Sequence, residues 1–137
     1  MCIRDSNNDL DLLGELRTAA FLAKLADGDA STLNAGTALR MVTIDAARAL
    51  GLEHEIGSLE HGKSADCIVI KPDLGMIPVY DAQAQVVYTN SSPCVQDVWV
   101  AGKPLMRNRK LLTLDVERLY ANAARWSEKI AENANLN

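Results

Sequence analysis

The sequence predicts a mixed α/β chain in which two helices precede a small strand-rich segment and one last helix. Three observations support this order. Apolar residues recur at helical spacing before residue 51, two glycines then bracket a polar turn that leads into a short apolar run, and helical spacing returns after residue 113. The composition changes near Gly51, which is the internal boundary that the pattern indicates.

Length and composition are those of an ordinary globular protein. The chain has 137 residues, of which 48% are hydrophobic and 23% are charged. A formal net charge of -4 provides no basic field that would attract nucleic acid or an anionic membrane. No apolar run approaches the roughly 18 to 20 residues that a membrane span needs, and the first residues lack a signal-peptide pattern. We therefore expect a cytoplasmic protein that has neither nucleic acid nor a membrane as a partner.

The first helix is expected from Asn8 to residue 27. From Asn8 onward an Asn or Asp is the candidate N-cap, Asp9 and Asp11 favour the positive end of the helix dipole, and Gly28 supplies the stop. The apolar positions between these ends are Leu13, Leu16, Ala20 and Ala23. Further apolar residues widen this stripe, so the helix needs a large partner surface.

A second helix is expected over residues 34–50. Asn34 is a candidate N-cap, and Gly51 stands where a C-terminal glycine belongs. Asp45 and Arg48 are three residues apart, which predicts a surface ion pair worth less than about 1 kcal/mol.

The segment from Gly57 to Ile70 predicts a turn that feeds a strand. Gly57 and Gly62 permit positive φ angles, and the apolar run Cys67–Ile70 predicts a strand that is buried on both faces. Cys67 is expected to be a buried, inert thiol. For Asp66 we expect a structural carboxylate that accepts backbone N–H groups of a glycine turn, with a catalytic carboxylate as the alternative.

Loops and one short helix are expected next. Residues 71–75 predict a loop, and Pro78 excludes a central strand. Asp81 is a candidate cap of a short helix that runs toward Thr89, whereas residues 85–89 alone favour a strand.

A hairpin and an amphipathic helix complete the chain. Residues 96–106 predict two strands joined by a tight turn at Gly102. Thr113 or Asp115 is expected to cap the last helix, and its end, residues 131–137, is expected to fray. The apolar seam of this helix consists of Val116, Leu119, Ala123, Trp126 and Ile130. Such a narrow seam predicts that the helix docks on a flat surface.

No catalytic constellation emerges from the residues alone. His54 and His61 are the only histidines and lie in the turn region among glutamates, which is typical of solvated surface, with a metal site as the alternative. The three cysteines are widely spaced, so we expect reduced thiols. No serine lies in the context of a nucleophile elbow. The chain is therefore interpreted as a supporting structure.

Five stretches together resemble one known family. They are the run from Ser6 to Asp11 (Ser-Asn-Asn-Asp-Leu-Asp), Glu15 to Ala20, Ala46 to Leu52, Gly57 to Asp66 (Gly-x-Leu-x-x-Gly-Lys-x-Ala-Asp), and Asp97 to Gly102. The chain resembles the C-terminal end of metal-dependent amidohydrolases, within them the 5-methylthioadenosine/S-adenosylhomocysteine deaminase group, which is related to the triazine hydrolases.

The resemblance implies a fold and a division of the chain. In that family a (β/α)-barrel holds one divalent metal, zinc or iron, which activates the water that displaces ammonia from an aminopurine. Residues 7–52 would then be the last helices of a TIM-type barrel. Residues 53–113 would form the C-terminal half of a small β-sandwich made from both chain ends, and residues 114–137 a docking helix with a frayed tail. Residues 1–6 resemble a non-native leader.

The resemblance also assigns a candidate substrate rim. Ser6, Asn7 and Asn8 would lie just past the last barrel strand, at the edge of the substrate pocket, while capping of the first helix by Asn7 and Asn8 is the alternative. The family pattern has a metal-binding Asp within Asp-Gly-Ala-Ala before the serine, where this chain has residues 2–5 (Cys-Ile-Arg-Asp). Two histidines cannot supply the family's four. We therefore assign no catalytic residue and no metal ligand to this chain, and the metal to a full-length parent.

Three functional hypotheses remain open at this point. The first is a piece of a deaminase of S-adenosylhomocysteine or 5-methylthioadenosine, inactive alone, whose partners are the missing N-terminal barrel and a nucleoside substrate, with homo-oligomers left open. The second keeps the family and changes the substrate to a triazine or guanine-type ring. The third is a non-enzymatic interaction module that folds cooperatively by itself, whereas the first predicts exposed apolar stripes and aggregation.

Overall fold

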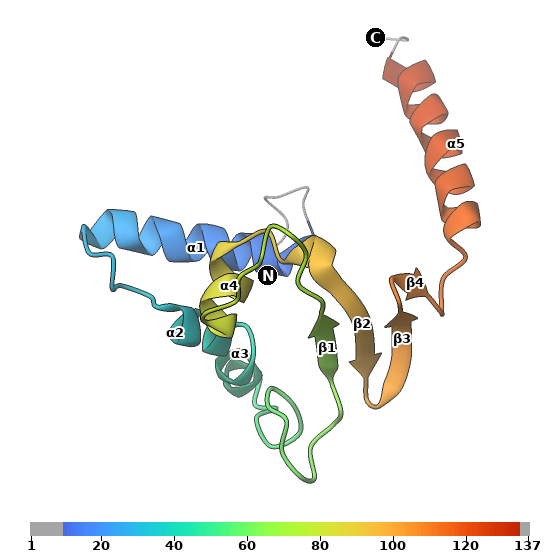
Figure 1. Ribbon diagram of the computed structural model, residues 1–137. Helices are drawn as coiled ribbons and strands as arrows, with labels where there is room; N and C mark the ends of the chain where they lie inside the picture. The colour runs from blue at the N-terminus through green and yellow to red at the C-terminus, as the bar shows by residue number, and fades with distance from the viewer. Residues whose placement is uncertain (1–9, 135–137) are drawn as a thin grey trace.

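The computed structural model describes residues 10–134, which form a cluster of short helices, a four-stranded sheet and a long last helix (Figure 1). The elements are α1 (Leu12–Asp27), α2 (Ala35–Met41), α3 (Ile44–Ala49), β1 (Cys67–Ile70), α4 (Ala82–Tyr88), the 3-10 helix η1 (Ser92–Cys94), β2 (Val95–Val100), β3 (Lys103–Arg107), β4 (Lys110–Leu111) and α5 (Val116–Ala134). This order of helices, strands and last helix agrees with the order that the sequence predicts.

The buried core lies where α4 packs against α1 and α2 (Figure 1). Its buried residues are Leu16, Ala20, Ala35, Ala38 and Val87. Alanines dominate this list, which lets the helix backbones approach closely. Phe21 stacks on Tyr88 with ring centroids 5.8 Å apart, and the Lys24 ammonium lies 5.4 Å from the Tyr88 ring centroid. α4 is thereby fixed to α1 although about 60 residues separate them in the sequence.

The first helix begins later than predicted. Asp11 is its N-cap, with a carboxylate that accepts the amide of Gly14 at 3.0 Å, so Asp11 precedes the first turn that we expected it to occupy. The predicted start at Asn8 lies outside the described residues. The end is as predicted, because Gly28 takes φ +64 and stops the helix.

The helix predicted over residues 34–50 is divided into α2 and α3. Its two ends are confirmed: Asn34 caps α2 through the amide of Thr37, and Gly51 follows α3 with φ +71. The division falls at Thr43, whose hydroxyl donates to the carbonyl of Leu39 at 2.7 Å while its backbone leaves the helical region. A threonine side chain that binds the preceding turn offers the backbone an alternative to the helix, which periodicity alone does not reveal.

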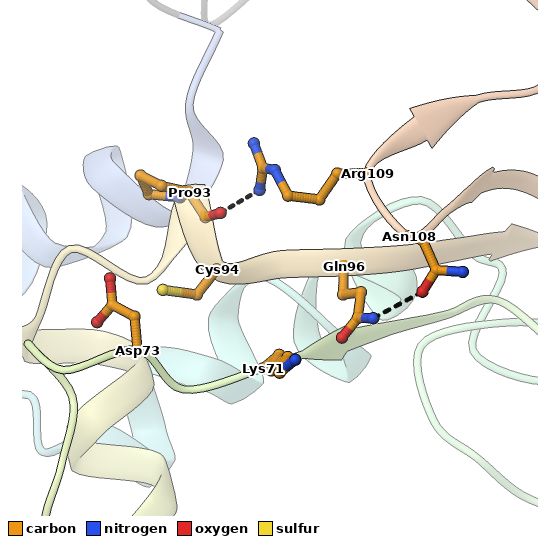
Figure 2. A pocket seen from close by; sticks show the side chains of 7 residues that line it. All are labelled: Lys71, Asp73, Pro93, Cys94, Gln96, Asn108 and Arg109. Carbon is orange, nitrogen blue, oxygen red and sulfur yellow. Dashed lines mark hydrogen bonds between the residues drawn. The ribbon is translucent and has the colours of Figure 1, made fainter.

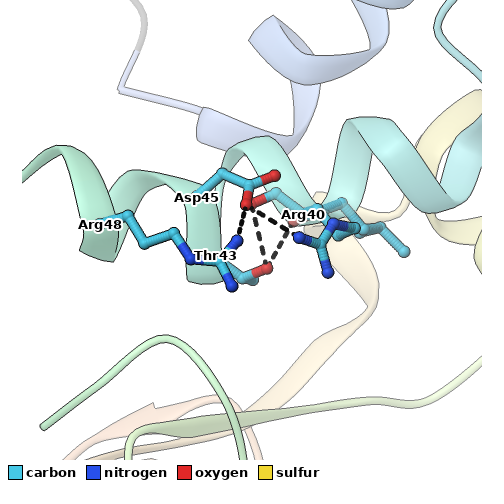
Figure 3. Close-up of polar contacts among 5 residues, drawn as sticks. Arg40, Thr43, Asp45 and Arg48 are labelled. Carbon is cyan, nitrogen blue, oxygen red and sulfur yellow. Dashed lines mark hydrogen bonds and ion pairs between the residues drawn. The ribbon is translucent and has the colours of Figure 1, made fainter. Parts of the chain in front are cut away.

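The predicted surface ion pair is confirmed and has a third member. Asp45 Oδ1 lies 2.6 Å from Arg48 Nη1 and 3.0 Å from Arg40 Nη2 (Figure 3). The third member, Arg40, comes from α2, so its ion pair with Asp45 bridges the break at Thr43. All three side chains are more than one third exposed.

The strands form one antiparallel sheet in the order β1-β2-β3-β4. The prediction that β1 is buried on both faces is wrong for this chain, because Ile68 is 48% and Val69 43% exposed. β1 is an edge strand that pairs with β2 alone. Cys67 is half-buried rather than buried, and the buried thiol among the described cysteines is Cys94.

The predicted hairpin is confirmed and extends further than expected. Ala101 and Gly102 join β2 to β3 with φ +49 and +73, the left-handed pair that a tight hairpin turn requires. Asn108 and Arg109 make a second turn with φ +48 and +63, and it leads into β4, which the sequence analysis missed. Without a glycine, this second turn carries little local signal.

The last two predicted helices are confirmed. Asp81 caps α4 by accepting the amides of Gln83 and Ala84, so the strand alternative for residues 85–89 is wrong. Asp115 rather than Thr113 caps α5, because its carboxylate accepts the amide of Arg118 at 3.0 Å. The helix continues through Ala131 to Ala134, beyond the start of the expected frayed tail.

Candidate functional site

The predicted substrate-rim residues Ser6, Asn7 and Asn8 lie outside the described residues, so their geometry stays a prediction. The described residues begin at Leu10, and Asp11 follows Asn8 by three residues in the sequence. Asp11 is positioned by its role as the α1 cap, and a Cβ added at Gly14 would lie 2.9 Å from its Oδ2. Position 14 therefore has little room for a side chain beside the Asp11 carboxylate.

Asp11 also joins the helical cluster to the sheet. The hydroxyl of Ser92, at the start of η1, donates a hydrogen bond to Asp11 Oδ1 across 81 residues of sequence. This hydroxyl is the main cause of a lowered pKa of Asp11, burial opposes it, and the amides of Gly14 and Leu13 assist it. The contact keeps the carboxylate charged at the positive end of α1. Sequence reasoning missed it, since no local pattern relates two residues so far apart.

The Gly57 to Asp66 motif folds as a braced turn. Lys63 extends a largely buried side chain whose ammonium donates to Ser58 Oγ at 2.6 Å and to Glu60 Oε1 at 3.2 Å. The hydrogen bond from Ser58 lowers the pKa of Glu60 most, and Lys63 lowers it further. Gly57 and Gly62 take φ +92 and +91, as predicted.

The motif ends in a clasp with the hairpin turn. Asp66 Oδ1 accepts the amide of Ala101 at 2.6 Å, and the amide of Gly102 donates to the carbonyl of Ala65 at 3.0 Å. The structural role predicted for Asp66 is therefore confirmed, although the turn that it binds is the β2–β3 turn and not its own. Two stretches that carry the family resemblance thus meet at one point.

One open pocket of about 270 Å³ lies beside the sheet where β1 ends and β2 begins (Figure 2). It is lined by Lys71, Asp73, Pro93, Cys94, Gln96, Asn108 and Arg109. Arg109 donates to the carbonyls of Pro93 and Val95, the latter at 3.0 Å, and Gln96 donates to Asn108 Oδ1 at 2.8 Å. These polar groups bind each other and the backbone. No histidine lines the pocket, so Cys94 has no partner base here.

The histidines do not converge on a metal site. His54 and His61 are both exposed, as expected for a solvated turn, and His54 Nε2 lies 3.8 Å from Glu53 Oε1. Between residues 10 and 134, no three His, Cys, Asp or Glu side chains are grouped so that they could hold a metal ion. The donor set in this part of the chain therefore does not fit the metal that the resemblance implies.

The described helices were compared with the length and apolar character of membrane-spanning helices. Within residues 10–134, no helix combines the length and the apolar character that crossing a membrane requires.

Comparison with known proteins gives consistent matches. The amidohydrolase family profile matches residues 2–105. A 5-methylthioadenosine/S-adenosylhomocysteine deaminase of Teredinibacter turnerae is 48% identical over 91% of this chain, which spans 28% of that relative. An adenosine deaminase structure from Xanthomonas campestris, with bound zinc, superposes with a TM-score of 0.89 at 43% identity, over 94% of this chain and 30% of the other.

A triazine-degrading enzyme matches as well. The zinc complex of an atrazine chlorohydrolase from Arthrobacter aurescens has a TM-score of 0.80 at 32% identity, over 89% of this chain and 27% of its own length. The chain thus spans less than one third of these relatives. Since the family profile covers about three quarters of the sequence, the chain belongs to the amidohydrolase family.

Proposed function

We propose that the chain is the C-terminal part of a metal-dependent amidohydrolase that deaminates an adenine nucleoside such as S-adenosylhomocysteine or 5-methylthioadenosine. The observation that carries the proposal is the 48% identity to a deaminase of that name over 91% of the chain. The atrazine chlorohydrolase is 32% identical, which favours the nucleoside over the triazine as substrate. A cyclic amidine is the reacting group in either case.

The chain's own residues act as scaffold in this proposal. Residues 7–52 are the last barrel helices, residues 53–113 are half of a small sandwich, and residues 114–137 are the docking helix and tail, as the resemblance implies. The hydrogen bond between Asp11 and Ser92 joins the first two of these units, and the hydrogen bond between Asp66 and Ala101 braces the second unit internally. Ser6, Asn7 and Asn8 would contribute to the substrate rim.

The metal belongs to the remainder of the protein in this proposal. The described donor set does not fit it, and Cys2 stands where the family pattern has its metal-binding Asp. The metal would supply an activated water, and its ligands would come from segments outside this chain. The isolated chain is therefore expected to be inactive, and the remainder of the protein is its first partner. The proposed location is the cytoplasm, as expected from the sequence.

A chimera tests the function. In the chimera, residues 7–137 of this chain would replace the matching segment of the Teredinibacter turnerae deaminase. All upstream residues would be those of the relative, and ammonia release would be measured. We expect release from S-adenosylhomocysteine and 5-methylthioadenosine by the chimera and none from the isolated chain. Release of ammonia by the isolated chain would contradict the proposal, and so would a folded chimera that releases no ammonia from either nucleoside.

A matched variant tests the predicted rim in the same chimera. Asn7→Ala and Asn8→Ala would each raise the KM for the nucleoside if the side chains contact it. If these asparagines have only a structural role, the melting temperature falls and the KM is unchanged. The non-enzymatic module predicts that neither variant changes any kinetic constant.

A further inference from the structure

The hydrogen bond between Asp11 and Ser92 lies at the point where the chain enters α1. Asp11 is the N-cap of α1, and its Oδ1 accepts the Gly14 amide at 3.0 Å as well as the Ser92 hydroxyl. Both side chains are partly buried. A Cβ added at Gly14 would lie 2.9 Å from Asp11 Oδ2 and 3.1 Å from its Cγ, so the carboxylate packs closely on the first turn. One carboxylate therefore sets the helix start and ties it to η1.

Ser92 is itself held by neighbouring elements. η1 begins directly after Ser91, which is 1% exposed and whose hydroxyl donates to the Val86 carbonyl of α4 at 2.7 Å. The Cys94 amide donates to the Ser91 carbonyl at 2.9 Å. α4 also contributes Val87 to the buried core of the helical cluster. The Ser92 hydroxyl therefore extends from a segment that is anchored in the core, and not from a free loop.

Apolar packing alone does not hold the entrance of α1. The first buried side chain of this helix is that of Leu16, whereas Leu10 and Leu12 are 72% and 46% exposed. The contact with Ser92 acts more than one turn ahead of Leu16. A hydrogen bond to a carboxylate is stronger than one between neutral groups. This polar contact thus positions a part of the chain that the core leaves open.

The residues that precede this point are the predicted substrate rim. Asn8 comes three residues before Asp11, and covalent geometry limits the separation of their Cα atoms to roughly 11 Å. A shift of the chain at Asp11 therefore reaches Ser6, Asn7 and Asn8 with few intervening bonds to absorb it. Groups that orient a substrate lose much of their effect when they are misplaced by about 1 Å.

We propose that Asp11 and Ser92 are positioning residues for the nucleoside, because their hydrogen bond fixes the segment that carries the predicted rim. The inference rests on the proposed deaminase function and on the predicted rim. Neither residue is assigned a contact with the substrate. Ser92, which belongs to the segment after residue 53, would thus influence substrate binding by residues at the start of α1. If the contact were only a brace, its loss would lower stability and leave substrate binding unchanged.

The main test measures KM and kcat of the chimera for S-adenosylhomocysteine. Ser92→Ala removes the hydroxyl, and we expect KM to rise at least about threefold while kcat changes less than about twofold. Ser92→Thr retains the hydroxyl and should recover most of this loss. The matched control is Asn34→Ala, which removes the cap of α2, beyond the other end of α1, and should destabilise the chimera without changing KM. An unchanged KM for Ser92→Ala, or an equal rise for Asn34→Ala, would overturn the proposal.

A second measurement does not require turnover. Hydrogen exchange of the backbone amides of residues 7–11 in the folded chimera reports how firmly this segment is held. We expect Ser92→Ala to speed this exchange at least about fivefold and Asn34→Ala to leave it unchanged. Equal exchange in Ser92→Ala and in the unmodified chimera would overturn the positioning role. A chimera that shows the exchange difference and releases no ammonia from either nucleoside would support the positioning of the segment and contradict the proposed function.

Discussion

The helical cluster and the segment from β2 to α5 differ in how much of their apolar surface this chain covers. Leu16, Ala38 and Val87 are at most 4% exposed, because α1, α2 and α4 surround them. Between Val95 and Asn133 no described residue is buried, although β2 and α5 both carry apolar faces. The comparison teaches that apolar patterning indicates a face to be covered and does not say whether the same chain covers it.

The largest expected effect comes from making the same Val→Asp substitution in each of the two regions. Val87→Asp buries a carboxylate in the helical cluster without a partner, and we expect a loss of about 3 kcal/mol or more in the free energy of unfolding. Val100→Asp makes the same change on β2, where the side chain is 46% exposed, and should cost less than about 1 kcal/mol. Urea unfolding followed by circular dichroism measures both. Similar losses would show that the sheet has a closed core after all.

A second pair of variants examines the boundary between the regions. Gly57 and Gly62 have nearly equal φ angles, +92 and +91, but a Cβ at Gly57 would lie 2.7 Å from Ala47 Cβ and 2.9 Å from Ile44 Cα, whereas Gly62 has nothing within 4 Å. Each change to alanine is expected to cost about 1 kcal/mol of folding free energy through backbone strain. The clash with α3 should roughly double or triple this loss for Gly57→Ala.

The measurement is again urea unfolding, with Gly62→Ala as the control for strain alone. Equal losses would mean that the motif turn moves away from α3 at little cost. The motif turn and α3 would then be coupled less tightly than the close approach of Gly57 to α3 indicates.

Local signals in the sequence predicted the ends of elements well. Asn34, Asp81 and Asp115 cap helices because a side-chain oxygen reaches amides two or three residues ahead, and Gly51 and Gly102 adopt φ angles that most residues avoid. Such effects act within one turn of chain, so the sequence displays them directly.

Other features depend on contacts that the local sequence does not display. Ser92 reaches Asp11 across 81 residues, and the burial predicted for Ile68 and Val69 presumes a covering layer that the described chain does not provide. Thr43 divides a helix through a hydroxyl contact that periodicity does not register. The predicted rim of Ser6, Asn7 and Asn8 came from resemblance and still awaits a test.

A smaller effect should come from the contact that joins the regions. Because the folded pKa of Asp11 is lowered, mainly by Ser92, its contribution is present above the unfolded value of about 3.9 and is lost as the pH falls through the folded value. Ser92→Ala should cost about 1 kcal/mol at pH 7, and the difference from the unmodified chain should shrink below about pH 4. Ser31→Ala removes a hydroxyl that binds the exposed Asp29 within one loop, and should not change unfolding. A pH-independent difference for Ser92→Ala would contradict the assigned cause.

The smallest effect is expected on the solvated side of the helical cluster. Asp45→Asn removes the charge that Arg40 and Arg48 share, and we expect a loss of less than about 0.5 kcal/mol, since all three side chains are exposed and water screens them. Asp45 also lies in the first turn of α3, where a negative charge favours the helix dipole. Arg48→Gln keeps that charge and removes one ion pair, so unfolding of both variants at low and high salt separates the two contributions. A loss for Asp45→Asn of more than 1 kcal/mol that is about equal at low and high salt would contradict this expectation. Asp45 would then hold α2 and α3 together across Thr43, and the helical cluster would depend on its polar surface as well as on its core.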